Sequence, residues 1–250
     1  MRPTVLILYA QGTNREMEAK QAFELAGASP EVVHINQLRK GEKHWKDYQL
    51  LAVPGGFSYA DTLGAGHLFA LDILTYFQDE VYQFIESGKP VIGICNGFQM
   101  LVKAGLLPKF SIDETSRSTL TFNENGQFEC RWVTLLPQSK KCLWTKNLQE
   151  EIYCPVAHGE GRFLLENPTD LQKLISSDQI ALRYSEHHYP ENPNGSISDI
   201  AGICNDKGNV LGLMPHPENH IFSFQHPRWT RGEQGKSGLT LFKNGVEFVL

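Results

Sequence analysis

Short apolar runs alternate with amphipathic stretches along the first part of the chain. Residues 4–9 are a continuous apolar run bounded by turn-forming residues, which predicts a β-strand buried on both faces. Residues 13–16 resemble a capping box that would begin a helix. Apolar residues then recur with helical spacing before Gly27, at Ala19, Ala22, Phe23 and Ala26. The pattern therefore predicts a strand followed by a helix.

The same alternation continues to about residue 95. Residues 31–35, 50–53 and 91–95 are strand-like, and residues 66–87 predict one long helix. Strands that alternate with helices form right-handed βαβ units. The first part of the chain therefore predicts an α/β fold, with an open, mainly parallel sheet and helices on both of its faces.

The C-terminal half has a different pattern. Four apolar segments, separated by turn-rich stretches, follow at 128–136, 180–184, 200–204 and 210–214. Such a pattern predicts a β-rich half with hairpins. Since the chain has no internal repeat and no long Pro-, Gly- or Ser-rich linker, we expect residues 1–250 to form a single domain.

Charge and cysteine content narrow the possible functions. The chain has 250 residues, a net charge of −5 and no stripe of clustered Lys and Arg, so we expect no nucleic-acid partner. The apolar run at residues 4–9 is too short for a signal peptide or a membrane span. The 5 cysteines include no Cys-x-x-Cys pair, which favours reduced thiols over disulfides or structural zinc. We expect a cytoplasmic protein without membrane association or a metal site.

Cys95 lies between a predicted strand and a predicted helix, which is the context of a nucleophile elbow. Gly93 and Gly97 stand two residues to either side, where the absence of a Cβ lets strand and helix approach closely. The amino end of a helix also favours a thiolate. The alternative interpretation is a buried structural cysteine, since cysteine is a common core residue.

A second motif, residues 214–218, contains the groups that a nucleophilic cysteine needs. Two prolines hold this segment extended, so the side chains of His216 and Glu218 can project to the same side. His216 could then take the thiol proton while Glu218 orients the imidazole. Taken alone, such a motif is more often a surface turn with a chance His and Glu.

Residues 54–57 follow the third predicted strand, where an open α/β sheet commonly places a ligand-binding loop. The backbone N–H groups of Gly56 and Asn96 are the candidate donors of an oxyanion hole. By itself, a Gly-Gly pair is more often an ordinary tight turn. The three motifs come from distant parts of the chain, yet they agree on one cysteine-based mechanism.

These motifs resemble the class I, or triad, glutamine amidotransferases. Members of that family have Gly-x-Cys-x-Gly followed by a glutamine, here Gln99, and a His-x-Glu pair near the C-terminus. Within the family, the resemblance is to the glutaminase subunits that serve formylglycinamidine ribonucleotide synthesis in purine biosynthesis. It rests on six motifs that follow in order, at 11–14, 54–59, 93–99, 158–162, 192–196 and 214–218.

The resemblance implies a flavodoxin-like sheet and a reaction on L-glutamine. Cys95 would attack the side-chain amide, His216 would protonate the departing ammonia, and water would hydrolyse the γ-glutamyl thioester. Glu218 would complete the triad, and Gly56 and Asn96 would bind the oxyanion. The residues expected to hold the glutamine are Gly55, Gln99, His158, Gly159 and Arg162.

The resemblance also implies partners. The ammonia would pass to a formylglycinamidine ribonucleotide synthetase subunit, and a further small subunit is possible. ATP and magnesium are expected on that synthetase, because the chain has no Gly-x-x-x-x-Gly-Lys-Ser/Thr loop, and no cofactor is expected on the chain itself. Two alternatives stay open: a cysteine peptidase or stress-type protein on a similar fold, which often places His where Asn96 stands, and a non-catalytic regulatory module.

Overall fold

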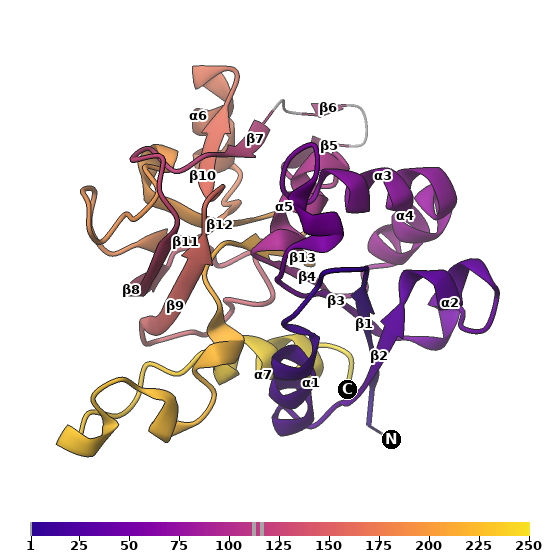
Figure 1. Ribbon diagram of the computed structural model, residues 1–250, viewed down its shortest axis with the longest axis horizontal. Helices are drawn as coiled ribbons and strands as arrows, with labels where there is room; N and C mark the ends of the chain where they lie inside the picture. Colours follow the sequence, from indigo (N-terminus) through magenta and orange to yellow (C-terminus); the bar gives the residue numbers. More distant parts are fainter. Residues whose placement is uncertain (1, 112–113, 116–117) are drawn as a thin grey trace.

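A nine-stranded sheet in the order β2-β1-β3-β4-β13-β12-β11-β8-β9 forms the centre of the molecule (Figure 1). The computed structural model describes residues 2–111, 114–115 and 118–250. Smaller two-stranded pairings join β10 to β7 and β5 to β6. Those four strands are β5 (Lys109–Ser111), β6 (Glu114–Thr115), β7 (Ser118–Thr121) and β10 (Arg162–Leu165).

The two halves of the large sheet differ in strand direction. The parallel half consists of β2 (Ser29–His34), β1 (Thr4–Tyr9), β3 (Leu50–Val53), β4 (Val91–Ile94) and β13 (Val210–Leu213). The antiparallel half continues from β13 through β12 (Ile200–Cys204), β11 (Ile180–Tyr184), β8 (Glu129–Pro137) and β9 (Ile152–His158). Both the predicted α/β class and the predicted β-rich C-terminal half are confirmed.

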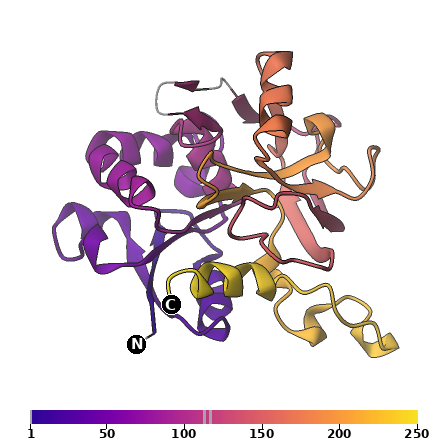
Figure 2. The ribbon, with the colours of Figure 1, turned by 180° about the vertical axis from the view of Figure 1, so that it is seen from behind.

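Helices cover both faces of the parallel half (Figures 1 and 2). One face carries α1 (Glu16–Leu25) and α7 (Leu239–Glu247), whose Phe23 and Phe242 rings meet edge to face at 5.1 Å. The other face carries α3 (His67–Tyr76), α4 (Gln78–Glu86) and α5 (Asn96–Lys103). The short α2 (Ile35–Arg39) follows β2, and α6 (Pro168–Ser176) lies beside the antiparallel half. No helix of the described residues is long and apolar enough to cross a membrane.

The central strands are buried because helices lie over both sides of them. All residues of β3, β4 and β13 are buried, which explains why their sequences are continuously apolar rather than alternating. Their side chains belong to one hydrophobic cluster, which also includes residues of β8, β9 and β11 from the antiparallel half. The cluster therefore connects the two halves and fixes the loops at the ends of the strands.

Two predicted helix boundaries are wrong. The helix α1 begins at Glu16 after Arg15 and has no side-chain cap, because the Thr13 hydroxyl instead accepts a hydrogen bond from the Ala10 N–H at 3.3 Å. The single helix predicted at residues 66–87 is two helices, α3 and α4. They are separated at Phe77, which leaves helical geometry at φ −142° and ψ 22° and packs its ring near that of Trp45.

Candidate active site

Three neighbouring parallel strands bring the distant sequence motifs together. Gly93 of β4 lies opposite Val53 of β3 on one side and Gly212 of β13 on the other. Parallel neighbours have their carboxyl ends at the same edge of the sheet, where α/β proteins bind ligands. The segments that leave this edge contain Gly55 after β3, Cys95 after β4 and His216 after β13.

Cys95 is held in an unusual backbone conformation at the turn from β4 into α5. Its φ is 51° and its ψ is −105°, and its side chain is only 5% exposed. Close packing around the turn sustains this strain: a Cβ at Gly97 would overlap the carbonyl oxygen of Val53, and one at Gly93 would lie 2.5 Å from the Leu101 side chain. The predicted reason for both glycines, a close approach of strand and helix, therefore agrees with the geometry.

His216 and Glu218 form a buried pair on the segment after β13. Nδ1 of His216 lies 2.7 Å from Oε1 of Glu218, and the residues are 3% and 0% exposed. The backbone N–H of His216 donates a hydrogen bond of 2.8 Å to the backbone carbonyl of Pro155 on β9, which connects the segment to the antiparallel half. Burial opposes a charged imidazole, but the Glu218 carboxylate and Cys95 outweigh that effect and raise the pKa of His216.

Cys95 and His216 both pack against Gly55, on the loop that follows β3 (the β3 loop). A Cβ at Gly55 would stand 2.7 Å from Cε1 of His216 and 3.3 Å from Cβ of Cys95, so only glycine fits there. Nδ1 of His216 is occupied by Glu218, whereas its buried Nε2 has no partner among the described residues. Nε2 is therefore the nitrogen available to the thiol. The Cys95 Sγ also lies 3.8 Å from the carbonyl oxygen of Ala157.

The two predicted oxyanion donors lie beside Cys95. Asn96 is the first residue of α5, so its N–H is one of those that a helix leaves without an intrahelical acceptor. Gly56 lies in the positive-φ region at 142° and faces Thr13, where a Cβ would come within 2.6 Å of the Asn14 nitrogen. Glycine is thus required at 56 by backbone conformation and by space.

A small pocket of about 160 Å³ opens at Cys95. Besides Cys95, four residues predicted for the site line it, namely Gly56, Gln99, His158 and Gly159. Three exposed aromatic side chains stand around it, those of Phe57, Phe122 and Phe128, and two of them, Phe57 and Phe128, stack on each other at 6.4 Å. The structure therefore gathers the elbow, the β3 loop and the end of β9 around one cavity.

Gln99 and His158 reach the pocket with most of their polar atoms already engaged. The Gln99 amide accepts from Asn96 Nδ2 at 3.0 Å and donates to the carbonyl of Glu160 at 2.6 Å. Nδ1 of His158 lies 3.1 Å from the side-chain oxygen of Asn123. Burial and the neighbouring His216 lower the pKa of His158 to about 3, so its imidazole is neutral. Both residues shape the wall of the pocket.

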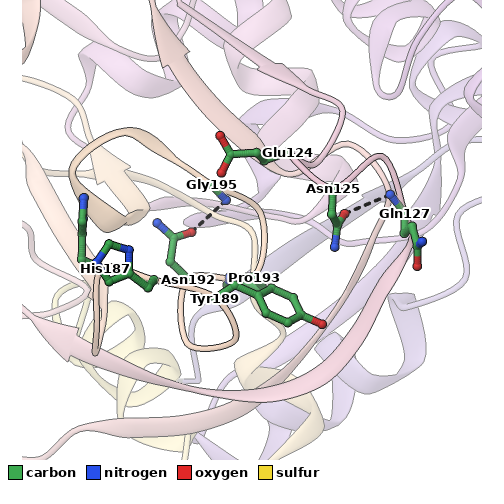
Figure 3. A pocket seen from close by; sticks show the side chains of 9 residues that line it. Glu124, Asn125, Gln127, His187, Tyr189, Asn192, Pro193 and Gly195 are labelled. Atoms are coloured by element: carbon green, nitrogen blue, oxygen red, sulfur yellow. Dashed lines mark hydrogen bonds between the residues drawn. The ribbon is translucent and has the colours of Figure 1, made fainter.

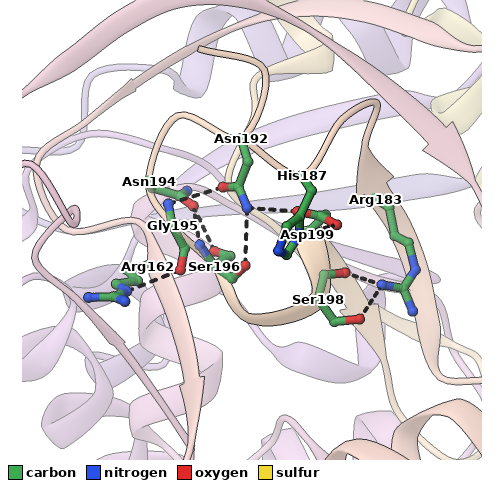
Figure 4. Close-up of polar contacts among 9 residues, drawn as sticks. All are labelled: Arg162, Arg183, His187, Asn192, Asn194, Gly195, Ser196, Ser198 and Asp199. Atoms are coloured by element: carbon green, nitrogen blue, oxygen red, sulfur yellow. Dashed lines mark hydrogen bonds and ion pairs between the residues drawn. The ribbon is translucent and has the colours of Figure 1, made fainter. Parts of the chain in front are cut away.

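Arg162 does not reach the pocket. Its Nε donates to the carbonyl of Gly195 at 3.1 Å, and its Nη2 pairs with Glu124 at 2.8 Å. Figure 4 shows the guanidinium beside Gly195, on the loop that connects β11 to β12. The position differs from the predicted one because β10 directs this side chain toward that loop rather than toward Cys95.

The motif at residues 192–196 contacts the pocket wall on the side away from the cavity. The Asn194 amide donates to the carbonyl of Gly161 at 2.9 Å and lies 3.5 Å from Nε2 of His158. The Asn192 side chain accepts from the Gly195 N–H at 3.0 Å (Figures 3 and 4). On its outer side, this loop and the chain near Glu124 line a second pocket of about 420 Å³ (Figure 3). The motif thus fixes His158 without lining the cavity at Cys95.

Two acidic residues at the pocket were missed by the sequence analysis. Asp61 accepts from Asn96 Nδ2 at 3.1 Å, and Glu160 accepts from the Ala65 N–H at 3.3 Å. Burial and the charge of Glu160 raise the pKa of Asp61 to about 6. Glu160 lies within a motif that the sequence analysis singled out, but Asp61 gave no signal of its own.

The fold and the site define an α/β protein with a strained cysteine beside a carboxylate-bound imidazole, an arrangement suited to acyl transfer from an amide. A family model of the CobB/CobQ-like glutamine amidotransferase domain matches residues 2–249. The chain belongs to this family, which confirms the resemblance found in the sequence.

Individual relatives make the similarity more specific. The phosphoribosylformylglycinamidine synthase subunit PurQ of Treponema denticola is 53% identical, and the match covers 100% of both chains. The subunit of the same name from Methanococcus maripaludis is 40% identical over 98% of this chain and 97% of its own. Among solved structures, a chain of PurLQS from Thermotoga maritima is similar with a TM-score of 0.78 and 30% identity, covering 100% of both chains.

Proposed function

We propose that this chain is the glutaminase subunit of phosphoribosylformylglycinamidine synthase, an enzyme of purine biosynthesis. It hydrolyses L-glutamine to glutamate and ammonia and supplies the ammonia to a synthetase subunit. Relatives that are 53% and 40% identical over nearly their whole lengths carry the name of that subunit. Membership of a glutamine amidotransferase family also leaves the cysteine peptidase alternative without support.

In the proposed mechanism Cys95 is the nucleophile and His216 is the proton carrier. His216 accepts the thiol proton at Nε2, and the sulfur forms a bond to the side-chain amide carbon of glutamine. The proton then passes from Nε2 to the amide nitrogen, so that the carbon–nitrogen bond breaks and ammonia leaves. Glu218 holds the other ring nitrogen and stabilises the imidazolium formed in between.

The remaining steps use the backbone around the elbow. The N–H groups of Gly56 and Asn96 stabilise the negative oxygen of each tetrahedral intermediate. Water then attacks the γ-glutamyl thioester, His216 takes a proton from it, and glutamate leaves as the Cys95 thiol is restored. Gly55 leaves room for the imidazole, since any side chain there would meet His216.

The chain works with other subunits in this proposal. The synthetase subunit and a further small subunit are its partners, because the similar solved chain belongs to PurLQS rather than to an isolated protein. ATP and magnesium act on the synthetase, where the amidine is formed. The enzyme works in the cytoplasm, where its 5 cysteines stay reduced; all are free thiols in this fold.

One observation carries the proposal: the buried contact of 2.7 Å between His216 and Glu218, next to a cysteine in a strained elbow. The test uses the Cys95→Ala variant in complex with the synthetase subunit. We expect glutamine-dependent amidine formation to fall to background while ammonia-dependent formation continues. Equal loss of both activities would refute the role of Cys95, and equal glutamine hydrolysis by the isolated chain and the complex would refute the coupling.

A further inference from the structure

The pocket at Cys95 has an acidic wall whose role the proposed mechanism does not explain. Asp61 and Glu160 both line the cavity and are partly buried. Of the residues described as lining it, none is Lys or Arg, and the pKa of about 3 leaves His158 uncharged. The wall is therefore negative at neutral pH, and it would attract a cationic group and repel an anionic one.

The acidic wall and Cys95 line the same small pocket, which has a volume of about 160 Å³. Asp61 contacts the side chain of Asn96, the residue next to Cys95, while the Glu160 backbone contacts Gln99, one turn further along α5. A helical turn advances about 5.4 Å. In glutamine three carbon–carbon bonds separate the amide carbon from the α-carbon, so an amide placed at Cys95 puts the α-ammonium group near this wall.

The structure holds Asp61 in place at a conformational cost. Its φ is 52°, and Tyr59, Ala60 and Leu63 on the same loop also have positive φ values, although none of the four is glycine. Left-handed conformations of such residues are unfavourable and persist where the surroundings enforce them. At the catalytic end of the same site, Nε2 of His216 is buried and without a partner among the described residues.

We propose that Asp61 and Glu160 bind the α-ammonium group of glutamine, so that its α-carboxylate points out of the pocket mouth. This inference rests on the proposed function. The two carboxylates lie close enough for each to repel the other's charge, and a bound ammonium group relieves that repulsion. The pocket therefore selects amides that carry a neighbouring amine, whereas Cys95, His216 and Glu218 act on the amide itself.

The test compares two substrates of the enzyme complex. L-Glutamine is one, and glutaramate, which is glutamine without its α-amino group, is the other. Ammonia release gives kcat/KM for each substrate with the wild type and with Asp61→Asn and Glu160→Gln. Glu150→Gln, which changes an exposed carboxylate outside the pocket, is the matched control.

We expect the wild type and the control to prefer glutamine strongly. Each pocket variant should lower kcat/KM for glutamine by about 10- to 100-fold, mainly through KM, and leave glutaramate nearly unchanged. A variant that only disturbs the fold would lower both substrates together, and that result, like an unchanged preference, would overturn the inference. A wild-type complex that hydrolyses neither amide would instead refute the proposed function.

Discussion

The two halves of the central sheet contribute to the site in different ways. In the parallel half, β4 and α5 position Cys95 through residues close to it in sequence, above all Gly93 and Gly97. In the antiparallel half, β9 fixes His216 from about sixty residues away, through the hydrogen bond from the backbone N–H of His216 to the backbone carbonyl of Pro155. The nucleophile therefore depends on local geometry, whereas its proton carrier depends on long-range packing.

The site lies at the junction of the two halves. β13 is the last strand that runs parallel to its neighbour on one side, and it pairs antiparallel with β12 on the other. Cys95 follows β4 and His216 follows β13, so the nucleophile and its base meet where the strand direction changes. Variants on either side of this junction test whether the two contributions are separable.

The largest expected effect belongs to the proton carrier. Glu218→Gln keeps a side chain of the same size beside His216 but removes the charge that raises the pKa of the imidazole against burial. The pKa of His216 should then fall, and the imidazolium formed during the reaction loses its stabilisation. We expect kcat for glutamine to fall by about 10²–10⁴-fold, with ammonia-dependent synthesis retained, when the complex is assayed at neutral pH.

A second His–Glu pair in the same C-terminal segment supplies the control. Glu233 lies 3.8 Å from Nε2 of His226, but its carboxylate is well exposed and outside the Cys95 pocket. Glu233→Gln should leave kcat within about twofold of the wild type, because exposed ion pairs contribute little. Near-normal kcat in Glu218→Gln would show that the imidazole does not depend on this carboxylate, and the triad assignment would be wrong.

Much of the parallel half could be predicted because its strands are buried on both faces. The limits expected for β1 and β3, at residues 4–9 and 50–53, match the observed strands. By contrast, β9 gave no prediction, since Pro155 interrupts its pattern. The structure tolerates that proline because β9 is an edge strand of the sheet, where a missing N–H costs no ladder hydrogen bond.

The same division applies to the site. Cys95 and His216 were predicted because short motifs with glycine or proline fix their backbones locally. Asp61 was missed because its position depends on a run of left-handed residues that have no glycine signature. Arg162 was predicted to hold glutamine, but it does not line the cavity, and nothing in its own motif indicates that Glu124 and Gly195 engage the guanidinium. Local patterns predict turns, but they do not predict which distant side chain meets another.

The next largest effect tests the local contribution, which is the close packing of α5 against β3 around the elbow. Gly97→Ala places a methyl group against the carbonyl of Val53 between β3 and α5, in a fully packed layer. We expect it to lower the free energy of unfolding by about 3 kcal/mol, measured by urea denaturation. Gly105→Ala is the control, because its added Cβ meets no atom within 4 Å, while its φ of 69° lies in the left-handed region, which helical Gly97 does not adopt.

The control separates the cost of a left-handed backbone from the cost of steric overlap with Val53. Gly105→Ala should lower the free energy of unfolding by only about 1 kcal/mol, the cost of a left-handed alanine. If the two variants lose the same free energy, close packing of α5 against β3 is not what sustains the elbow. In that case the strain at Cys95 would need another source.

The smallest expected effect concerns Arg162, which lies outside the pocket. Arg162→Met removes a guanidinium that pairs with the exposed Glu124 and does not line the cavity at Cys95. We expect KM for glutamine to stay within about twofold and the free energy of unfolding to fall by no more than about 1 kcal/mol, as for other surface pairs. Glu124→Gln removes the ion pair but keeps the Arg162 hydrogen bond to Gly195, so its loss should be no larger. A tenfold rise in KM for Arg162→Met alone would mean that the guanidinium turns toward glutamine in the working complex. The strand β10, outside the large sheet, would then contribute a charge to substrate binding, in addition to the support that the antiparallel half gives to His216.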